Sequence, residues 1–395
     1  MESIHAEDIF TKIKNGENVR LTDRIILGDF DIDSLGLARD EDGYICIDSS
    51  ISIINSVIEG SANLNNTIFL KSVVFSGTII KGNISFEFSR FEKLADFSSV
   101  IFDSNATFWH VQFIGKADFS PTHIKGPTYL KGTQFNKNAN FEFAKFFDLA
   151  EFSEVTFHND SVFFGAEFDK EADFCETKFE KCADFYSAKF KADLIFWDAE
   201  FEFIQMEWGT ELSKFHANWN DIRRSLVCDY GPTYLSMIKS FKELEQFDDA
   251  DNCYYDYRKW SQRNKPFGWS KFSDYLAWIS CGYGVRPSYT VFFSIFLIFL
   301  FAVLFQIAAI FYSPSSPSTI YKNTSVISLK SALISIQGID YQSFFTSLIL
   351  SLKIFVTGEL FDVSGIARYV AMLELPVRGL LFALFMVVLV KKLIR

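Results

Sequence analysis

Phe91-Glu-Lys-Leu-Ala-Asp-Phe-Ser-Ser-Val-Ile-Phe102, FEKLADFSSVIF in one-letter code, contains a spacing of phenylalanines that recurs through much of the chain. Its phenylalanines at 91, 97 and 102 are separated by six and then five residues. Continued in both directions, this alternation meets 29 positions from Ile47 to Phe201, all Phe, Leu or Ile and 22 of them Phe. They are 47, 53, 58, 64, 69, 75, 80, 86, 91, 97, 102, 108, 113, 119, 124, 130, 135, 141, 146, 152, 157, 163, 168, 174, 179, 185, 190, 196 and 201. The chain therefore follows an 11-residue repeat.

A small residue, mostly Ala, Ser, Thr or Val, stands two positions before each bulky one. Examples are Ala62, Ala95, Ala106, Ala117, Ala139, Ala150, Ala166, Ala172, Ala183 and Ala199. An 11-residue apolar repeat can mark a right-handed helical supercoil. However, Phe alternating with β-branched residues, Gly and Asp-Phe pairs is poor helix-forming material. We therefore predict a β-solenoid whose coils stack one bulky and one small inward residue on each short side.

The small and bulky residues also form a three-residue unit, Ala-(Asp/Asn)-(Leu/Phe). It occurs at 62–64, 95–97, 117–119, 139–141, 172–174 and 183–185. This unit resembles that of pentapeptide-repeat proteins. The resemblance implies a right-handed quadrilateral β-helix over residues 47–203, with Phe and Leu inside. Strict members of that family step by five throughout, so the sixth residue here leaves open whether the chain forms a 20-residue or a 22-residue coil.

The bulk composition excludes several functional classes. The net charge is −11 without a long basic run, which does not favour a nucleic-acid backbone as partner. The six cysteines form no CxxC pair and the five histidines no metal-ligand spacing, so we expect a reduced setting and no metal. Since no phosphate-binding loop or catalytic motif is found either, we predict no enzyme activity, no catalytic residues and no cofactor. The acidic start of the chain predicts no signal peptide.

The solenoid leaves three functional alternatives open. It is a docking or ligand-sensing surface, or a rigid spacer. Acidic pentapeptide solenoids also resemble DNA and bind topoisomerases, which gives the third alternative. Residues 1–46 are expected to cap the first coil, because an open end would expose an edge.

After Phe201 the pattern becomes helical, and residues 204–265 are predicted to form a helical connector. Between Tyr234 and Glu245, apolar residues lie on one helical face, and a second short helix begins after a turn at 247–250. This hairpin resembles the tetratricopeptide-like unit of some bacterial membrane proteins. It caps the solenoid or couples it to the membrane.

Residues 266–288, aromatic and with cations at Lys271 and Arg286, suit a segment at the bilayer interface. Their Gly-Tyr-Gly triplet, 282–284, has the letters of a potassium filter. It precedes the first span instead of lying between two spans, so we do not interpret it as a filter.

Two stretches are predicted to cross a membrane. Residues 289–312 carry no charge and are long enough for about 30 Å of hydrocarbon. Residues 369–390 are long enough to span only if they include Glu374 and Arg378, which lie four positions apart on one helical face. Such charges are tolerated in a membrane if they form an ion pair or face water. Basic residues precede the first span and follow the second, so the positive-inside rule places both termini in the cytoplasm. We expect a multi-pass protein of the bacterial inner membrane.

Residues 343–366 are expected to enter the membrane and turn back, because their apolar part, 343–356, is too short to span and a third crossing would reverse the C-terminus. The order of these elements, a span, a short helix, a polar turn and a second span, resembles that of the two-helix pore domain of potassium-type channels. In that resemblance the filter region is Thr357, Gly358, Glu359, Leu360, Phe361 and Asp362, and the pore-lining candidates are Lys353, Glu374, Arg378 and Gly379. Glu359-Leu360-Phe361 replaces Gly-Tyr-Gly, so the carbonyl cage should be lost. In a tetramer, four copies of Glu359 or Asp362 would form a ring that favours cations. Alternatively, these acids bind the short helix or Arg368.

The fold class expected is thus a multidomain β + α membrane protein: a β-helix, an α-helical connector and a two-span pore-loop domain. The function expected is a weakly selective ion channel, tetrameric because two and a half helices cannot enclose a water path. Its partners are the lipid bilayer, three further copies, permeant ions, and an unknown gating ligand or protein at the solenoid, with a nucleotide or oligonucleotide possible. Bacterial stress response or phage defence is the suggested context. The alternative is a non-conducting, membrane-anchored scaffold that docks a protein partner.

Overall fold

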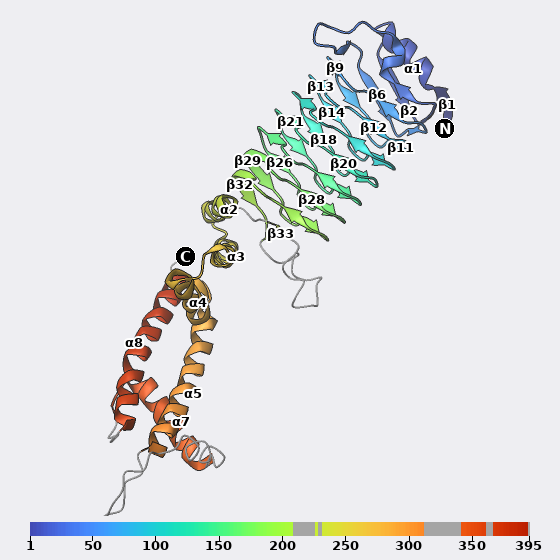
Figure 1. Ribbon diagram of the computed structural model, residues 1–395. Helices are drawn as coiled ribbons and strands as arrows, with labels where there is room; N and C mark the ends of the chain where they lie inside the picture. The colour runs from blue at the N-terminus through green and yellow to red at the C-terminus, as the bar shows by residue number, and fades with distance from the viewer. Residues whose placement is uncertain (208–225, 228–230, 312–340, 361–365, 394–395) are drawn as a thin grey trace, which may run out of the picture. The chain divides into compact units, whose positions relative to one another are not determined.

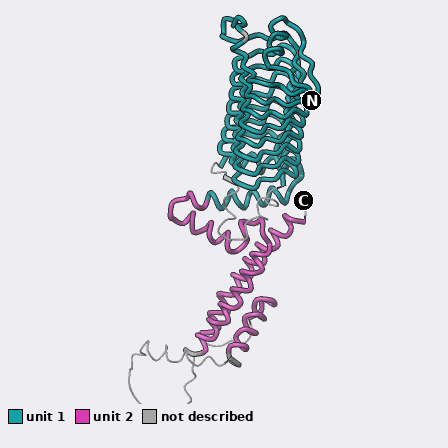
Figure 2. The backbone as a smooth tube through the Cα atoms, turned by 90° about the vertical axis from the view of Figure 1, so that its right-hand side faces the viewer, with its two compact units in different colours: residues 1–261 teal, residues 262–395 magenta. Residues whose placement is uncertain are grey.

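The computed structural model describes residues 1–207, 226–227, 231–311, 341–360 and 366–393 (Figure 1). The chain divides into two compact units, Met1–Ser261 and Gln262–Arg395 (Figure 2). The first unit is a β-solenoid with helices at its ends, and the second consists of helices.

Parallel strands of the solenoid form three sheets. The first has nine strands: β1 (Glu2–His5), β3 (Arg24–Leu27), β7 (Val57–Ile58), β11 (Ile79–Ile80), β15 (Ile101–Phe102), β19 (His123–Ile124), β23 (Lys145–Phe146), β27 (Glu167–Phe168) and β30 (Lys189–Phe190). The second also has nine: β4 (Phe30–Asp31), β8 (Ala62–Asn63), β12 (Ile84–Ser85), β16 (Ala106–Thr107), β20 (Thr128–Tyr129), β24 (Ala150–Glu151), β28 (Ala172–Asp173), β31 (Leu194–Ile195) and β33 (Leu226–Val227).

The third sheet contains two ladders that meet in β29 (Lys178–Asp184), which also pairs with β32 (Glu200–Gln205). One ladder is β2 (Val19–Thr22), β6 (Ile51–Ile54), β10 (Val73–Val74), β14 (Ala95–Asp96), β18 (Ala117–Asp118), β22 (Ala139–Asn140) and β26 (Ser161–Val162). The other is β5 (Ile45–Ile47), β9 (Thr67–Phe69), β13 (Arg90–Phe91), β17 (Gln112–Phe113), β21 (Gln134–Phe135) and β25 (Thr156–Phe157). The solenoid thus has four sides and about nine turns.

From β5 to β31, residues paired between successive coils are 22 positions apart, as in Val73 with Ala95 and Ile79 with Ile101. The first pairs of β2, β3 and β4 with the next coil, and the pair of β31 with β33, are 32 positions apart. One coil therefore consists of two of the 11-residue repeats. The shorter 20-residue coil, left open by the sequence, is excluded.

The core is the predicted ladder of bulky residues. All 29 positions from Ile47 to Phe201 are buried, none with more than 8% exposure. Rings one coil apart stack, with centroids 5.0 Å apart for Phe91 and Phe113 and 4.8 Å apart for Phe113 and Phe135. Such ring pairs stabilise a fold by about 0.5–1.5 kcal/mol beyond the area that they bury. The inward Phe ladder is confirmed.

The Asp or Asn of the three-residue unit closes a turn. Asp96 Oδ1 accepts a hydrogen bond from the Ser98 backbone N–H at 2.9 Å, and the Val100 N–H donates to the Phe97 carbonyl at 3.2 Å. Between them Ser99 has a φ of 56°. A positive φ recurs in register with the 11-residue repeat, at Asn55, Asn66, Gly77, Phe88, Ser99, His110, Gly132, Phe143, Glu154, Gly165, Glu176, Ser187 and Asp198. The five-residue step is therefore a tight corner, closed by a side chain suited to turns.

At the N-terminal end the ladders begin before residue 47, with β1, β2, β3 and β4. Their inward residues are mostly aliphatic, such as Val19 and Ile26, so the phenylalanine pattern does not reveal them. Helix α1 (Ala6–Lys14) joins the same core, and the Phe10 ring lies 4.5 Å from that of Phe30.

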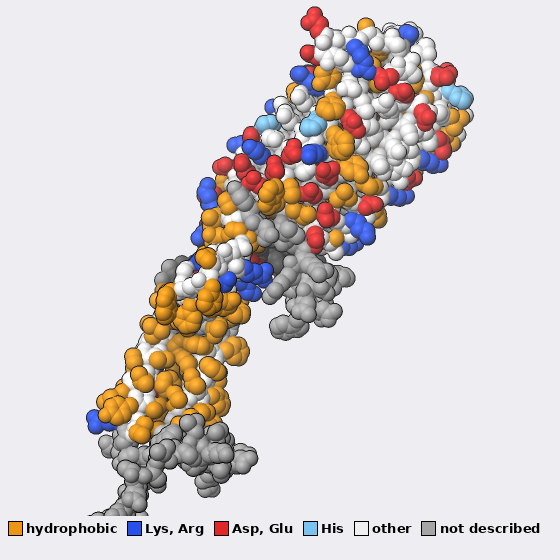
Figure 3. All heavy atoms as spheres, viewed as in Figure 1, with side chains coloured by type: hydrophobic (Ala, Val, Ile, Leu, Met, Phe, Trp, Pro, Cys, Tyr) orange, Lys and Arg blue, Asp and Glu red, His pale blue; other side chains and the backbone are white. Residues whose placement is uncertain are grey.

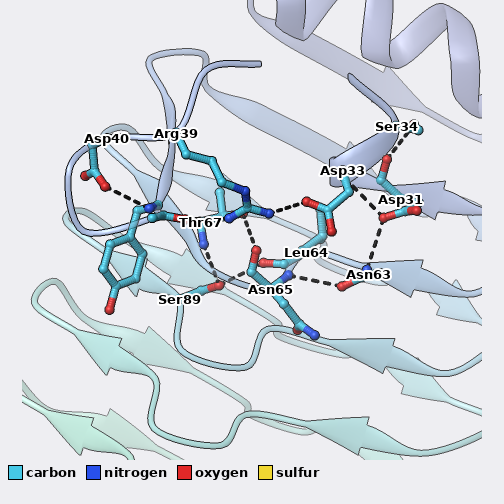
Figure 4. Close-up of polar contacts among 12 residues, drawn as sticks. Asp31, Asp33, Ser34, Arg39, Asp40, Asn63, Leu64, Asn65, Thr67 and Ser89 are labelled. Carbon is cyan, nitrogen blue, oxygen red and sulfur yellow. Dashed lines mark hydrogen bonds and ion pairs between the residues drawn. The ribbon is translucent and has the colours of Figure 1, made fainter. Parts of the chain in front are cut away.

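The segment after β4 contains a short 3₁₀ turn, η1 (Ile32–Leu35), and is attached through polar contacts (Figure 4). Asp31 Oδ1 accepts from Asn63 Nδ2 at 3.0 Å, and Arg39 forms an ion pair with Asp33. The first contact joins β4 to β8 on the next coil, and the second closes the segment on itself.

Helices α2 (Gly231–Glu243) and α3 (Phe247–Asn264) follow the last coil. Ser240 Oγ accepts from the Ile204 N–H at 2.6 Å, and the Thr233 hydroxyl donates to the Ala199 carbonyl at 3.1 Å. Helix α2 thus satisfies edge groups of the solenoid, which supports the capping role of the connector.

The turn predicted at 247–250 is wrong, since Phe247 already begins α3. Asp248 and Asp249 stand in the first turn of that helix. Acids at this position favour the positive end of a helix, so the residues that suggested a turn instead start a helix.

The second unit contains α4 (Trp269–Cys281), a 3₁₀ turn η2 (Gly282–Gly284), α5 (Pro287–Phe311), α7 (Tyr341–Thr357) and α8 (Ile366–Leu393). Gly282 and Gly284 have φ values of 53° and 79°, so the Gly-Tyr-Gly triplet is a joint between α4 and α5. By length and composition, α5 and α8 qualify as membrane spans, whereas α7 is too short.

Candidate functional site

The candidate site is the end of α7 and the part of α8 beside it. Helix α7 packs against both long helices: Ile354 and Ala371 are fully buried in one cluster with Phe301 and Phe305 of α5. This small core fixes α7 between α5 and α8 and brings polar groups from all three helices together.

One hydroxyl joins the three helices. Ser351 Oγ of α7 lies 2.6 Å from Glu374 Oε1 of α8 and 3.1 Å from the Ile298 carbonyl oxygen of α5. Ser351 and Glu374 both have 0% exposure. The other carboxyl oxygen, Glu374 Oε2, is buried without a partner among the described residues. Since a buried polar group needs a partner, the Ser351 contact determines where Glu374 can lie.

Arg378, one turn further along α8, reaches the end of α7. Its Nε donates to the Phe355 carbonyl at 2.5 Å, and Nη2 donates to the Val356 carbonyl at 3.1 Å. The last carbonyls of a helix have no partner within the helix and form the negative end of its dipole. The guanidinium therefore caps α7 with a positive charge.

Gly358 ends α7 as its capping glycine. It has a φ of 73°, and its N–H donates to the Ile354 carbonyl at 2.9 Å. This is the geometry of a left-handed helix cap, which favours glycine. A Cβ at this position would also meet the Arg378 guanidinium, so the absence of a side chain leaves room for that contact.

The remaining predicted residues of the filter region lie after this cap. The Thr357 hydroxyl donates to the Lys353 carbonyl at 2.8 Å and accepts from the Glu359 N–H at 3.2 Å. Glu359 and Leu360 are exposed, and no contact between the Glu359 carboxylate and Arg368 or α7 is found in the described part of the chain. Phe361 and Asp362 lie outside the described residues.

The four pore-lining candidates do not share one surface. Lys353 and Gly379 are exposed, Arg378 is partly buried, and Glu374 is fully buried. Among the described residues no ion pair joins Glu374 to Arg378, although their spacing favours one; each contacts α7 instead. That any of these side chains lines a pore stays a prediction.

Sequence reasoning missed the partners of these two residues. The signal available was the spacing of Ala371, Glu374, Arg378 and Leu381, which follow a helical stripe with Ala371 and Leu381 as apolar members. A stripe of this kind places Glu374 and Arg378 against neighbouring helices. It does not say which atoms of those helices they meet.

The outer surface of the second unit is apolar. Figure 3 shows hydrophobic side chains covering much of these helices. Exposed members include Phe292, Phe296 and Phe299 on α5 and Leu380, Phe382 and Val387 on α8. An apolar surface of this extent is typical of a face that meets lipid or other protein.

Helix α4 also exposes large aromatic side chains around its start. Trp269 is 84% exposed, and Phe267 and Phe272 are exposed as well. Nearby, Lys265 Nζ forms an ion pair with the buried Asp274, 2.5 Å from its Oδ2. Aromatic residues with cations are typical of the membrane interface.

The solenoid surface carries ladders of alternating charge. Lys189 Nζ lies 2.9 Å from Glu167, and Lys145 lies 3.1 Å from the same carboxylate one coil away. The hydrogen bond from Lys189, reinforced by Lys145, lowers the pKa of Glu167. Lys81 pairs with Glu59 in the same way. Part of the acidic charge is therefore compensated, which weakens the comparison with DNA.

No group of His, Cys, Asp or Glu residues suited to a metal occurs in the described ranges. Burial, together with the hydrogen bond and charge of Asp173, raises the pKa of Cys175 to about 12. This thiol is consequently protonated at neutral pH and a poor nucleophile. The absence of enzyme activity stays a prediction.

Comparison with known proteins identifies the repeat. Residues 75–123 match the family model described as pentapeptide repeats (9 copies). No curated protein and no solved structure matches the chain. Pentapeptide repeats folded as a β-solenoid are thus shown, together with two helices of membrane-spanning length.

Proposed function

We propose that the chain forms a weakly selective, ion-conducting membrane pore, assembled from four copies and gated through its solenoid. The observation that carries the proposal is α7: an apolar helix too short to span, packed between two helices of spanning length and ended by a glycine cap. In a membrane, a half-spanning helix followed by a polar turn is tolerated where it is buried in protein or meets a water-filled cavity.

The remaining parts of the proposal follow from the same arrangement. Four copies would bring the turns at 357–360 together around an axis, and the exposed Glu359 would face permeant ions. Both chain ends would lie in the cytoplasm of a bacterial cell, where the solenoid is accessible to a nucleotide, an oligonucleotide or a protein signal. A membrane effector in stress or phage defence would use such a pore to collapse the ion gradient.

The test uses the purified full chain in planar bilayers. We expect single-channel currents with little preference for potassium over sodium. Glu359→Gln should lower the cation preference, since it removes one negative charge per copy. Absence of current, or a sharp preference for potassium over sodium, would contradict the proposal.

A second candidate, a non-conducting scaffold, is favoured by the self-contained solenoid with its own continuous core. Deleting residues 343–366 discriminates between the two. A scaffold should still reach the membrane and present the solenoid. A pore should lose its current and its toxicity on overexpression.

A further inference from the structure

The negative end of α7 is neutralised by a residue from another helix. The aligned peptide dipoles of a helix place about half a negative charge at its C-terminus. Aimed at a pore, such an end attracts cations. Here the Arg378 side chain donates to the carbonyls of Phe355 and Val356 at that end, at 2.5 and 3.1 Å. A full positive charge stands where half a negative charge would otherwise act.

The charge of Arg378 is not cancelled by the nearest acid on its own helix. Glu374 lies one turn away, but its carboxyl group contacts Ser351 at 2.6 Å, and no ion pair joins it to Arg378 among the described residues. The exposed Glu359 follows the glycine cap without a side-chain partner in the described part of the chain. Positive and negative side chains therefore stand at the same helix end.

We propose that Arg378 is a specificity-determining residue: its guanidinium cancels the cation-attracting end of α7 and thereby keeps the pore weakly selective between cations and anions. The inference rests on the proposed function, because it requires the end of α7 to face permeant ions. The loss of the filter glycines explains poor discrimination between potassium and sodium. The role inferred for Arg378 concerns a different property, the discrimination between cations and anions.

The experiment measures the reversal potential of the full-length channel in a potassium chloride gradient. Arg378→Gln removes the charge and keeps a donor. The expected result is a rise in the potassium-to-chloride permeability ratio of about threefold to tenfold, the size expected for four screened charges near an aqueous path. Arg378→Lys keeps the charge and loses the two-pronged donor, and it should retain the wild-type ratio.

The matched control is Arg368→Gln, which removes the same charge from α8 at an exposed position with no contact to α7 among the described residues. It should change the ratio by less than Arg378→Gln. A merely structural role for Arg378 would alter current amplitude or stability and leave the reversal potential unchanged.

The outcomes separate the two proposals. Wild-type currents with the same reversal potential in Arg378→Gln would overturn this inference and leave the pore standing. An equal shift in Arg378→Lys, or in Arg368→Gln, would also overturn it, because the effect would then come from capping geometry or from general surface charge. Absence of wild-type current would remove the pore and this inference together.

Discussion

At the residue scale, this chain uses phenylalanine in two opposite environments that lie two positions apart. Phe141 is a core residue with 1% exposure, and its ring stacks on Phe163 at 4.8 Å. Phe143 is 54% exposed and has a φ of 55°, in the left-handed region. The repeat thus places the same side chain inside or at a corner according to its position in the 11-residue unit.

Phe141→Ala is predicted to destabilise the solenoid by about 3–5 kcal/mol, because it removes buried contacts and leaves a cavity between stacked rings. The free energy of unfolding is measured by denaturant titration of the full chain in detergent, followed by far-ultraviolet circular dichroism.

The control is Phe143→Gly, which should change the stability by no more than about 1 kcal/mol, since glycine adopts a positive φ without strain. Equal losses in the two variants would contradict the inward assignment of Phe141.

At the element scale, the strand and turn units of the solenoid differ from the helices of the second unit in what specifies them. Two-residue strands such as β14 and β18 have little stability alone and exist because the coil before and the coil after pair with them. The helices are specified by continuous apolar sequence, and α7 in addition by its contacts with α5 and α8.

Helix α4 is predicted to lie in the interface of a lipid bilayer, because Trp269 and its aromatic neighbours are exposed just before α5. In vesicles containing the full chain, lipids brominated near the headgroup should quench part of the tryptophan fluorescence. Trp269→Phe should remove a measurable share of that quenching.

Trp109→Phe is the matched control, because Trp109 is partly exposed on the solenoid. It should leave the quenching by brominated lipid unchanged. Undiminished quenching in Trp269→Phe would show that the start of α4 does not contact lipid.

At the scale of the whole molecule, the constant 22-residue length of the coils from β5 to β31 makes this part of the solenoid modular. Thr128 pairs with Ala106 before it and with Ala150 after it, one coil away in each direction. If residues 128–149 are removed, Ala150 takes the place of Thr128 and every inward residue keeps its side. If residues 128–147 are removed, only 20 residues of a 22-residue coil are lost. All later residues then shift by two positions relative to the ladders of the preceding coils.

We expect the deletion of 128–149 to retain cooperative thermal unfolding and the deletion of 128–147 to lose it, because a broken register leaves bulky side chains without their partners. Circular dichroism of the purified full-length variants checks this. Similar unfolding curves for the two deletions would argue against a coil of fixed length.

The solenoid, its inward ladder and the two helices of membrane-spanning length follow from sequence alone, because these depend on patterns within a few residues: a five-and-six alternation and long uncharged stretches. Single positions in the ladder, such as Phe97 and Phe102, follow from that spacing alone. The ends of the ladders did not follow, since β2 to β4 carry mostly aliphatic residues in place of phenylalanine.

The contacts of Glu374 and Arg378 depend on how the helices pack. Their spacing on α8 permits an ion pair with each other, and the local sequence contains nothing against it. Packing of α7 against α8 instead brings the Ser351 hydroxyl to Glu374 and the Phe355 and Val356 carbonyls to Arg378. The physical reason is that unpaired carbonyls at a helix end are strong acceptors, and which side chain reaches them depends on how helices distant in sequence pack together.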